Sequence, residues 1–399
     1  MLINSNNNSD RKEIEQDDSI KPLIPLLSNL FFEDKRWLDL VFHTSVNEIA
    51  NKKSLNNLIS IDSHTTVGDT MVILKNNNIF SAPIFKENCV YNSQGQSIRV
   101  DNGGEGDDWE NKHYLSDYIG MLGVHEIIAF MIGIFFEEKT SYQLNYSPYS
   151  TSETIEIETW KLPKPKDISK NSQFFKDTPI LDLLNLAPPN PRKMDYIFST
   201  DNMAMAIKVL SESKLTRLPI VKDNTIIGIL SRTDILSKLV SNKQILPEIF
   251  HKPLSYFPRQ HLLDSDYWSI YPDTTASFAF HIMEKKEKQS VAIVKDKQLV
   301  SNFSLTDIKG IDESNILDLN LEIKDYLEKI NKSIDKNKIV SATLNTSLID
   351  VIQLIVQHKI HGLWILRPTN QDSNHHDEIE GFISYKSILD IINNLIKLL

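Results

Sequence analysis

The chain has 399 residues, of which 41% are hydrophobic and 24% charged, and its net charge is −10 at pH 7. This composition is typical of a soluble globular protein with room for two or three domains. The acidic balance argues against nucleic acid and an anionic membrane surface as partners, because both attract basic proteins. The single cysteine, Cys89, excludes an internal disulfide and a multi-thiolate metal site, and we expect the chain in the cytoplasm or the nucleus.

Two segments stand out by their polarity. Residues 1–20 are rich in Asn, Ser and Asp and have little to bury, which predicts a disordered tail. Residues 119–136 form the most apolar stretch, but they carry His125 and Glu126 and several glycines. A membrane span needs about 20 apolar residues almost free of charge, so we predict a buried strand followed by a helix instead.

Four segments share one order of features, and they span residues 38–136, 179–242, 250–312 and 320–399. Each begins with a short extended stretch, followed by a helix with apolar residues at helical spacing, two strands and a second helix. The first helix of each copy is expected to begin at a residue whose side-chain oxygen can cap it, and the middle of the next strand follows after 17 or 18 residues in every copy. These expected caps are Thr65, Asp201, Thr275 and Thr346.

The copies differ mainly in the segments between their strands. Short polar segments at 222–224 and 295–297 predict hairpin turns in the second and third copies, and 370–377 is a longer polar loop in the fourth. The first copy contains a long loop insertion, 86–117. Residues 137–178, which are rich in Ser, Thr, Pro and Lys, are expected to be a linker between the first two copies.

This pattern resembles the CBS domain, and the resemblance covers most of residues 38–399. It rests on the residues at 118–122, 216–219, 304–307 and 358–364. It implies an α/β fold of four CBS repeats, paired into two Bateman modules. Among CBS proteins, the chain is most similar to the γ regulatory subunit of AMP-activated/SNF1-type protein kinases, and it also resembles plant SNF4-like proteins and yeast CBS proteins that restrain a type 2A phosphatase.

The resemblance implies that a Ser/Thr-x-x-Asp turn after the last strand of a repeat binds the ribose of an adenosine ligand. Ser231 with Asp234 and Ser304 with Asp307 match this turn fully. A carboxylate can accept two hydrogen bonds from a vicinal diol. The same turn is also a good helix cap, and the sequence leaves both roles open. The equivalent residues 123–126 lack the hydroxyl, and 384–387 lack the acid.

The phosphates of such a ligand would need basic partners. By resemblance these are Arg217, with Thr216 beside it, and His361, both near the start of a central strand; Lys386 is a further candidate. Arg217 could equally be a solvated strand-end cation, and His361 a packed or capping histidine. Repeats one and three have no cation at the corresponding positions, so we expect fewer or weaker nucleotide sites than in the γ family.

No catalytic motif is present, and the chain is not expected to be an enzyme. The resemblance implies a noncatalytic regulatory subunit that senses energy state by binding AMP, ADP or ATP, needs no cofactor, and modulates an AMPK/SNF1-type kinase. Its partners would be a kinase catalytic subunit and a β-type scaffold subunit. The alternative is a CBS interaction scaffold, with a phosphatase or another partner, in which ligand binding is reduced or lost.

Overall fold

The computed structural model describes residues 35–50, 58–86, 89–91, 97–99, 114–135, 165–186, 195–213, 215–296, 298–311, 315–332, 334–335, 338–368 and 378–397. The predicted tail at 1–20 and the polar loop at 370–377 lie outside these residues.

Each repeat forms one three-stranded sheet, in which the first strand is parallel and the third antiparallel to the middle one. The sheets consist of β1 (Ile61–Asp62), β2 (Ser81–Phe85) and β5 (Tyr118–Gly123); β6 (Ile197–Phe198), β7 (Arg217–Lys222) and β8 (Thr225–Ser231); β9 (Ser269–Ile270), β10 (Ser290–Lys295) and β11 (Gln298–Ser304); and β12 (Ser341–Ala342), β13 (Gly362–Arg367) and β14 (Glu378–Ser384). A small hairpin of β3 (Cys89–Tyr91) and β4 (Ser97–Arg99) lies within the 86–117 insertion.

The four sheets share a detail that supports the repeat assignment. In each antiparallel pair the register shifts once, after Ile84, Ile220, Ile293 and Ile365. Such a shift bends the strand and increases its twist. These isoleucines are fully buried, so the bend lies over the core. Its recurrence at the equivalent position indicates one supersecondary unit used four times.

Two helical segments belong to each sheet. The crossover helices are α6 (Val67–Asn76), α10 (Met203–Glu212), α13 (Ala276–Lys285) and α15 (Leu348–His358), and the helices after the last strands are α7 (Val124–Phe135), α11 (Arg232–Ser241) and α16 (Tyr385–Lys397). The predicted element order is therefore confirmed, including the strand and helix expected over 119–136. In repeat three a six-residue 3₁₀ helix, η5 (Leu305–Gly310), takes the place of the second helix.

Three of the four expected caps are wrong by one residue. The first crossover helix is capped by Thr66, whose side chain accepts from the Asp69 N–H; Asn202 and Ser347 have the same role in α10 and α15. In each case the following residue was the better acceptor, because the capping oxygen must lie three residues before the N–H it binds. Only α13 has its N-cap at the expected residue, Thr275, but the Thr275 side chain forms no capping hydrogen bond.

Within the expected linker 137–178, residues from 165 onward form helix α8 (Pro165–Asp177). Phe175 on this helix is 1% exposed, and its ring lies 5.8 Å from Phe130 and 5.6 Å from Phe135 of α7. The helix is followed by α9 (Ile180–Leu186). Helices α8 and α9 therefore belong to the core around repeat one. The prolines and lysines that precede α8 in the sequence led to the prediction of a linker here.

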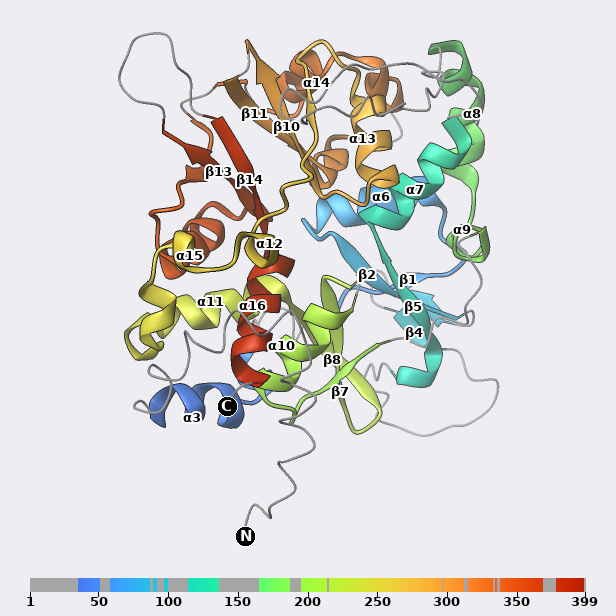
Figure 1. The fold of residues 1–399 in the computed structure, drawn as a ribbon. Coiled ribbons are helices and arrows are strands. Elements are labelled where there is room, and N and C mark those ends of the chain that lie inside the picture. The colour runs from blue at the N-terminus through green and yellow to red at the C-terminus, as the bar shows by residue number, and fades with distance from the viewer. Residues whose placement is uncertain are drawn as a thin grey trace, which may run out of the picture.

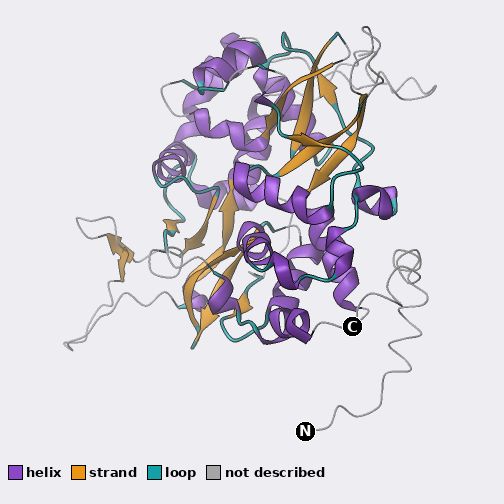
Figure 2. Cartoon of the chain, turned by 90° about the vertical axis from the view of Figure 1, so that its left-hand side faces the viewer, coloured by secondary structure: helices purple, strands orange, loops and turns teal. Residues whose placement is uncertain are grey.

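The sheets pair within two modules. Phe85, Tyr118, Val221 and Ile226 pack between the sheets of repeats one and two. Trp364 and Phe382 of repeat four pack with Ala292, Val294 and Leu299 of repeat three. Apart from a small hairpin, Figure 2 shows the strands in two groups with helices between them. This is the predicted pairing of four CBS repeats into two Bateman modules.

The helices join the two modules through two larger cores. One core combines repeats two and four, and also includes α3 (Lys35–His43) and α4 (Val46–Ile49). The other combines repeats one and three, together with α8, α9 and α14 (Ile323–Lys329). In Figure 1 the helices of the first core lie at the lower left and those of the second at the upper right. Each core thus contains residues of both modules, and all four repeats meet at the centre.

Candidate functional site

Two cations from different repeats lie against one aromatic ring at this centre. Phe80 directly precedes β2 of repeat one. The Arg217 guanidinium, at the start of β7, lies 5.2 Å from the Phe80 ring centre and donates to Ser81 Oγ at 3.4 Å. Lys309 Nζ, from η5, lies 3.3 Å from the same ring centre and donates to Asn78 Oδ1 at 3.0 Å. Repeat one therefore holds cations supplied by repeats two and three.

Repeat four contributes His361, which directly precedes β13. Its ring lies edge-on to Phe80 at 5.4 Å and to Tyr385 at 5.5 Å. Burial and the nearby positive charges, chiefly those of Arg217 and Lys309, together lower the pKa of His361 to about 4. The imidazole is therefore neutral at pH 7.

Two more basic residues are near enough to His361 to lower its pKa. They are His125, in the first turn of α7, and Lys332, just after α14. The set of Arg217, Lys309, His361, His125 and Lys332 is called the central basic cluster below. The cluster contains at least one residue from every repeat, so the centre has more cations than the equivalent strand positions alone predicted.

The charges of the cluster are only partly compensated. Burial and the neighbouring Arg217 charge lower the pKa of Lys309 to about 8. Burial also lowers the pKa of Arg217, while Asp234 and Tyr385 act in the opposite direction. His125 is exposed to solvent, yet the surrounding protein lowers its pKa, against an opposing effect of Glu126. A bound anion would relieve this repulsion, which is the electrostatic character of a phosphate site.

Each four-residue Ser/Thr-x-x-Asp turn, or its equivalent in another repeat, is called a tetrad below. The first complete tetrad, residues 231–234, caps helix α11 and leaves one carboxylate oxygen of Asp234 unused. Ser231 donates to Asp234 Oδ2 from its backbone N–H at 2.8 Å and from its hydroxyl at 2.6 Å. Among the described residues both bonds use Oδ2, so Oδ1 remains for a ligand. Burial raises the pKa of Asp234, and the bonds from Ser231 and the charge of Arg217 oppose this shift. The capping role and the ligand role are thus compatible here.

The second complete tetrad differs at this same oxygen. Ser304 donates to Asp307 Oδ2 from its N–H at 2.9 Å and from its hydroxyl at 3.3 Å. Asp307 Oδ1, however, forms an ion pair with Lys332 Nζ. The Asp307 side chain is only 2% exposed. The two tetrads that look identical in the sequence therefore present different chemistry.

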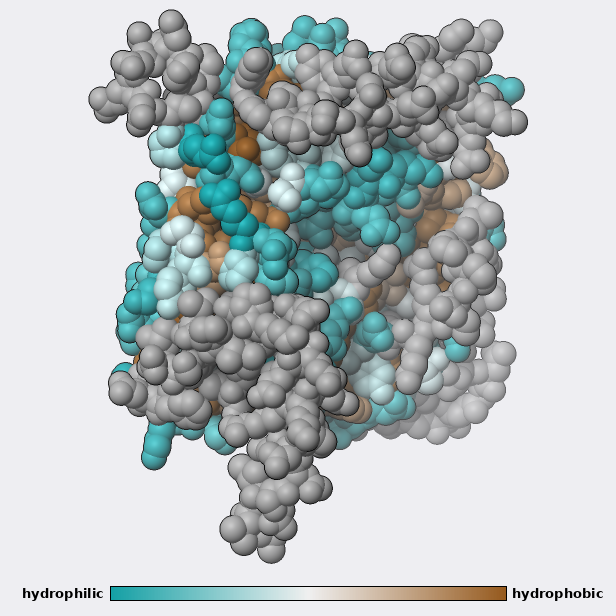
Figure 3. All heavy atoms as spheres, viewed as in Figure 1, coloured by the Kyte–Doolittle hydropathy of each residue, from teal (hydrophilic) through white to brown (hydrophobic). Residues whose placement is uncertain are grey.

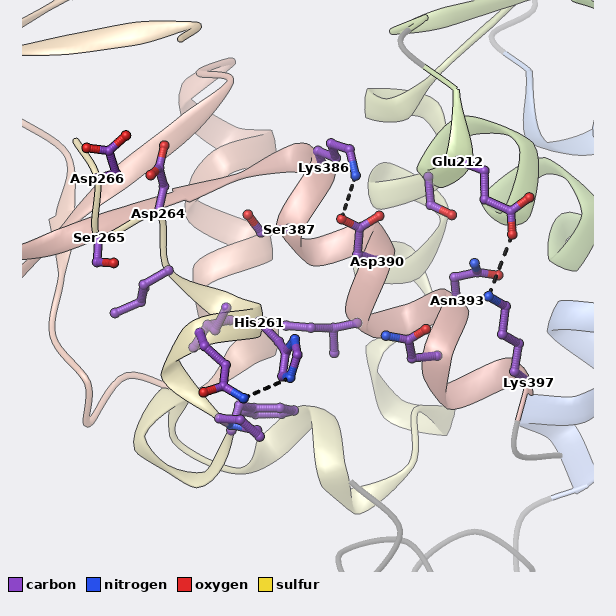
Figure 4. A pocket seen from close by; sticks show the side chains of 18 residues that line it. Glu212, His261, Asp264, Ser265, Asp266, Lys386, Ser387, Asp390, Asn393 and Lys397 are labelled. Atoms are coloured by element: carbon purple, nitrogen blue, oxygen red, sulfur yellow. Dashed lines mark hydrogen bonds and ion pairs between the residues drawn. The ribbon is translucent and has the colours of Figure 1, made fainter. Parts of the chain in front are cut away.

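The structure does not bring the other two candidates into the cluster. Thr216 is exposed, and its carbonyl accepts from the Arg232 N–H at 3.3 Å. Lys386 pairs with Asp390 at 2.8 Å on α16. Both Lys386 and Asp390 line a separate cavity of about 690 Å³ between α16 and α12 (Arg259–Leu262) (Figure 4). Four carboxylates line it, those of Glu212, Asp264, Asp266 and Asp390, against the two lysines Lys386 and Lys397, and this balance disfavours phosphate.

The sequence reasoning missed Lys309, although a signal was present. Lys309 follows the first residue of its tetrad by five positions. At the same offset the other repeats have Ile128, Leu236 and Leu389, which are all buried. A lysine at a position that is otherwise aliphatic indicates a different local structure, here the 3₁₀ turn of η5.

Comparison with known proteins identifies the class. The family model of the CBS domain matches residues 192–241 and 332–394, so the second and fourth repeats are CBS domains. The fold as a whole is similar to that of protein MJ1225 of Methanocaldococcus jannaschii, a proposed archaeal homologue of γ-AMPK. That match has a TM-score of 0.54 at 14% identity, and it covers 88% of this chain and 100% of that chain. It confirms the predicted tandem CBS fold.

Two further solved structures are more distant. An uncharacterised conserved protein of Pyrococcus horikoshii has a TM-score of 0.45 at 13% identity, covering 88% of this chain and 100% of that chain. A complex of CBSX2 with AMP has a TM-score of 0.27 at 15% identity, covering 50% of this chain and 98% of that chain. A search of the curated proteins finds no match.

Two other kinds of site are absent from the part of the chain that the structure describes. That part contains no group of three or more His, Cys, Asp or Glu side chains placed to hold a metal ion. None of its helices combines the length and apolarity that a bilayer crossing requires. On the face shown in Figure 3, apolar side chains appear in small groups among hydrophilic ones.

Proposed function

We propose that this chain is a noncatalytic regulatory protein that binds an adenine nucleotide, AMP, ADP or ATP, where its four repeats meet. The observation that carries the proposal is the central basic cluster, to which every repeat contributes a basic residue. The cations Arg217 and Lys309 and the neutral imidazole of His361 lie against the Phe80 ring. The phosphates lie among these cations, and the ribose lies at Asp234, whose Oδ1 is available and whose charge acts on Arg217.

Binding at this position regulates because the cluster spans both modules. Arg217 belongs to the first module, and Lys309 and His361 belong to the second. A phosphate between them favours the arrangement of modules that brings these groups together. A ligand shifts such an equilibrium only by its difference in affinity for the two arrangements, and the cations that converge on the phosphate supply that difference.

The regulated partner that we propose is an AMPK/SNF1-type protein kinase, bound through its catalytic subunit and a β-type scaffold subunit, with energy sensing in the cytoplasm or the nucleus as the role. The resemblance of the sequence to γ subunits and the similarity of the fold to a proposed γ-AMPK homologue support this. Co-purification with a kinase catalytic subunit and its β partner is the expected result.

A second candidate is an interaction scaffold with reduced ligand binding. It is favoured by Asp307, which is already paired with Lys332, and by Ser387, which replaces the acid of the fourth tetrad. In this case the chain would co-purify with a phosphatase or another partner and would not respond to nucleotide. The two candidate functions therefore differ in the expected response to nucleotide as well as in the expected partner protein.

The test of nucleotide binding is calorimetric titration of the purified chain with AMP, ADP and ATP. Because a charge-assisted hydrogen bond contributes roughly 1.5–3 kcal/mol, Arg217→Ala is expected to weaken binding by about 10- to 100-fold. Arg259→Ala is the matched control, since Arg259 is an exposed arginine whose partner is Glu380. Equal affinities of wild type and Arg217→Ala would contradict the proposed site.

A further inference from the structure

The position of Lys332 is fixed by the end of the helix that precedes it. Helix α14 ends in a turn in which Asn331 adopts a left-handed conformation with φ 61°. The Asn331 N–H donates to the Glu328 carbonyl at 3.0 Å, and the Lys332 N–H donates to the Leu327 carbonyl at 2.8 Å. This pattern of two bonds is a Schellman motif, for which Asn is a tolerated residue. The turn therefore projects Lys332 from a defined backbone.

The same helix is anchored directly to Asp307. The hydroxyl of Tyr326, on α14, donates to the Asp307 carbonyl at 2.7 Å, and Tyr326 itself is buried. The backbone of Asp307 and its side chain are thus both bound by the α14 segment, through Tyr326 and Lys332 respectively. Because the side chain of Asp307 is almost completely buried, its pairing with a cation satisfies a charge that would be costly to leave alone.

The ion pair occupies the oxygen that the first tetrad leaves open. In both tetrads the serine binds Oδ2. Among the described residues no lysine pairs with Asp234 Oδ1, whereas Asp307 Oδ1 is bound to Lys332. A hydroxyl group of a ligand can bind Asp307 Oδ1 only in competition with an ammonium group of the same chain.

We propose that Lys332 is an internal latch that closes the third cleft to the ribose of a nucleotide, so that the chain has one open ribose site, at Asp234, instead of two. This inference rests on the proposed function for the identity of the ligand. It predicts that the number of bound nucleotides is limited by one side chain, and that removal of this side chain opens a further site.

The test is calorimetric titration of the full chain with AMP, comparing wild type with Lys332→Ala. The variant is expected to bind one more AMP per chain than wild type, and the double variant Lys332→Ala/Asp307→Asn is expected to lose this additional site. Lys332→Arg preserves the cation and should behave as wild type. Lys329→Ala is the matched control, because Lys329 is similarly exposed, 56% against 47%, but pairs with Asp318. A folded Lys332→Ala variant with unchanged stoichiometry would overturn the latch.

A second variant covers the case in which Lys332→Ala does not fold. Asp307→Asn in the wild-type background is expected to leave AMP binding unchanged, because the latch already blocks this carboxylate, whereas Asp234→Asn is expected to weaken it. Loss of AMP binding in Asp307→Asn would overturn the latch. Failure of the proposed function is recognised separately, because wild type would then show no AMP binding that depends on Arg217. An AMP site that is gained in Lys332→Ala and lost in the double variant would still support the latch.

Discussion

At the scale of single residues, His361 has an environment that links its protonation to the stability of the fold. Its pKa is lowered to about 4, below the ordinary value of 6.5, by burial and by four other basic groups. The unfolded chain therefore binds more protons than the folded chain between these two pH values. The stabilising effect of keeping His361 neutral is complete above pH 6.5 and is lost as the pH falls toward 4.

This linkage gives a prediction for thermal unfolding. The Tm of the chain should decrease as the pH falls from 7 to 5, and His361→Gln should make this decrease smaller, because glutamine does not titrate. His281, whose pKa is also lowered to about 4 by burial and by Lys285, is expected to account for part of the remaining decrease. Scanning calorimetry at several pH values measures the effect, with His43→Gln as the surface control. An unchanged pH dependence in His361→Gln would be inconsistent with the buried environment described here.

At the scale of elements, Arg232 connects two helices of repeat two. It is the first residue of α11 and is 3% exposed. Its Nη2 donates to the Leu210 carbonyl at 2.9 Å and to the Ser213 carbonyl at 3.3 Å, at the end of α10. Burial lowers its pKa to about 10, so the guanidinium remains charged at pH 7. Arg232 thus stabilises the C-terminal end of one helix from the first turn of another.

Replacement of Arg232 by Met should therefore destabilise the fold. The change removes two charge-assisted bonds and leaves buried carbonyl groups without their donor, which predicts a loss of about 2–4 kcal/mol in the free energy of unfolding. Lys324→Met, which removes an exposed pair with Glu322, should cost less than about 1 kcal/mol. Urea denaturation compares the two. A similar, small loss in both variants would show that Arg232 does not have this role.

The element order could be predicted from the sequence because it depends on local patterns. Alternating and helical apolar spacing identified the strands and helices of the four repeats, except that the second helix of repeat three is the 3₁₀ helix η5. The polar segments at 222–224 and 295–297 predicted hairpin turns. Helix α8 could not be predicted in this way, since it has only a few apolar residues, Ile168, Phe174 and Phe175, among lysines and polar residues. The burial of Phe175 depends on contacts with α7.

The candidate site was predictable only where the repeats are equivalent. Arg217 and His361 were found because the resemblance expects a cation near the start of a central strand, and they lie at the first residue of β7 and directly before β13. Lys309 lies at an otherwise aliphatic position, and Lys332 follows a connecting helix, so neither could be placed at the centre without the packing of the repeats. The Lys332–Asp307 pair joins residues 25 positions apart and distinguishes two tetrads that the sequence shows as alike.

At the scale of the whole molecule, the two cores explain why a ligand at the centre can affect both modules. One core combines repeats two and four, and the other combines repeats one and three, so each crosses from one module to the other. The central basic cluster lies where these two cores meet. A change in the relative position of the modules must therefore alter the distances between Arg217, Lys309 and His361.

The most direct test of this central claim is a crystal structure of the chain with bound AMP. We expect the phosphate within hydrogen-bonding distance of Arg217 and Lys309 beside Phe80, with the ribose hydroxyls at Asp234. A phosphate bound instead in the cavity beside α16, or a nucleotide that touches only one module, would contradict the claim that the four repeats form one shared anion site.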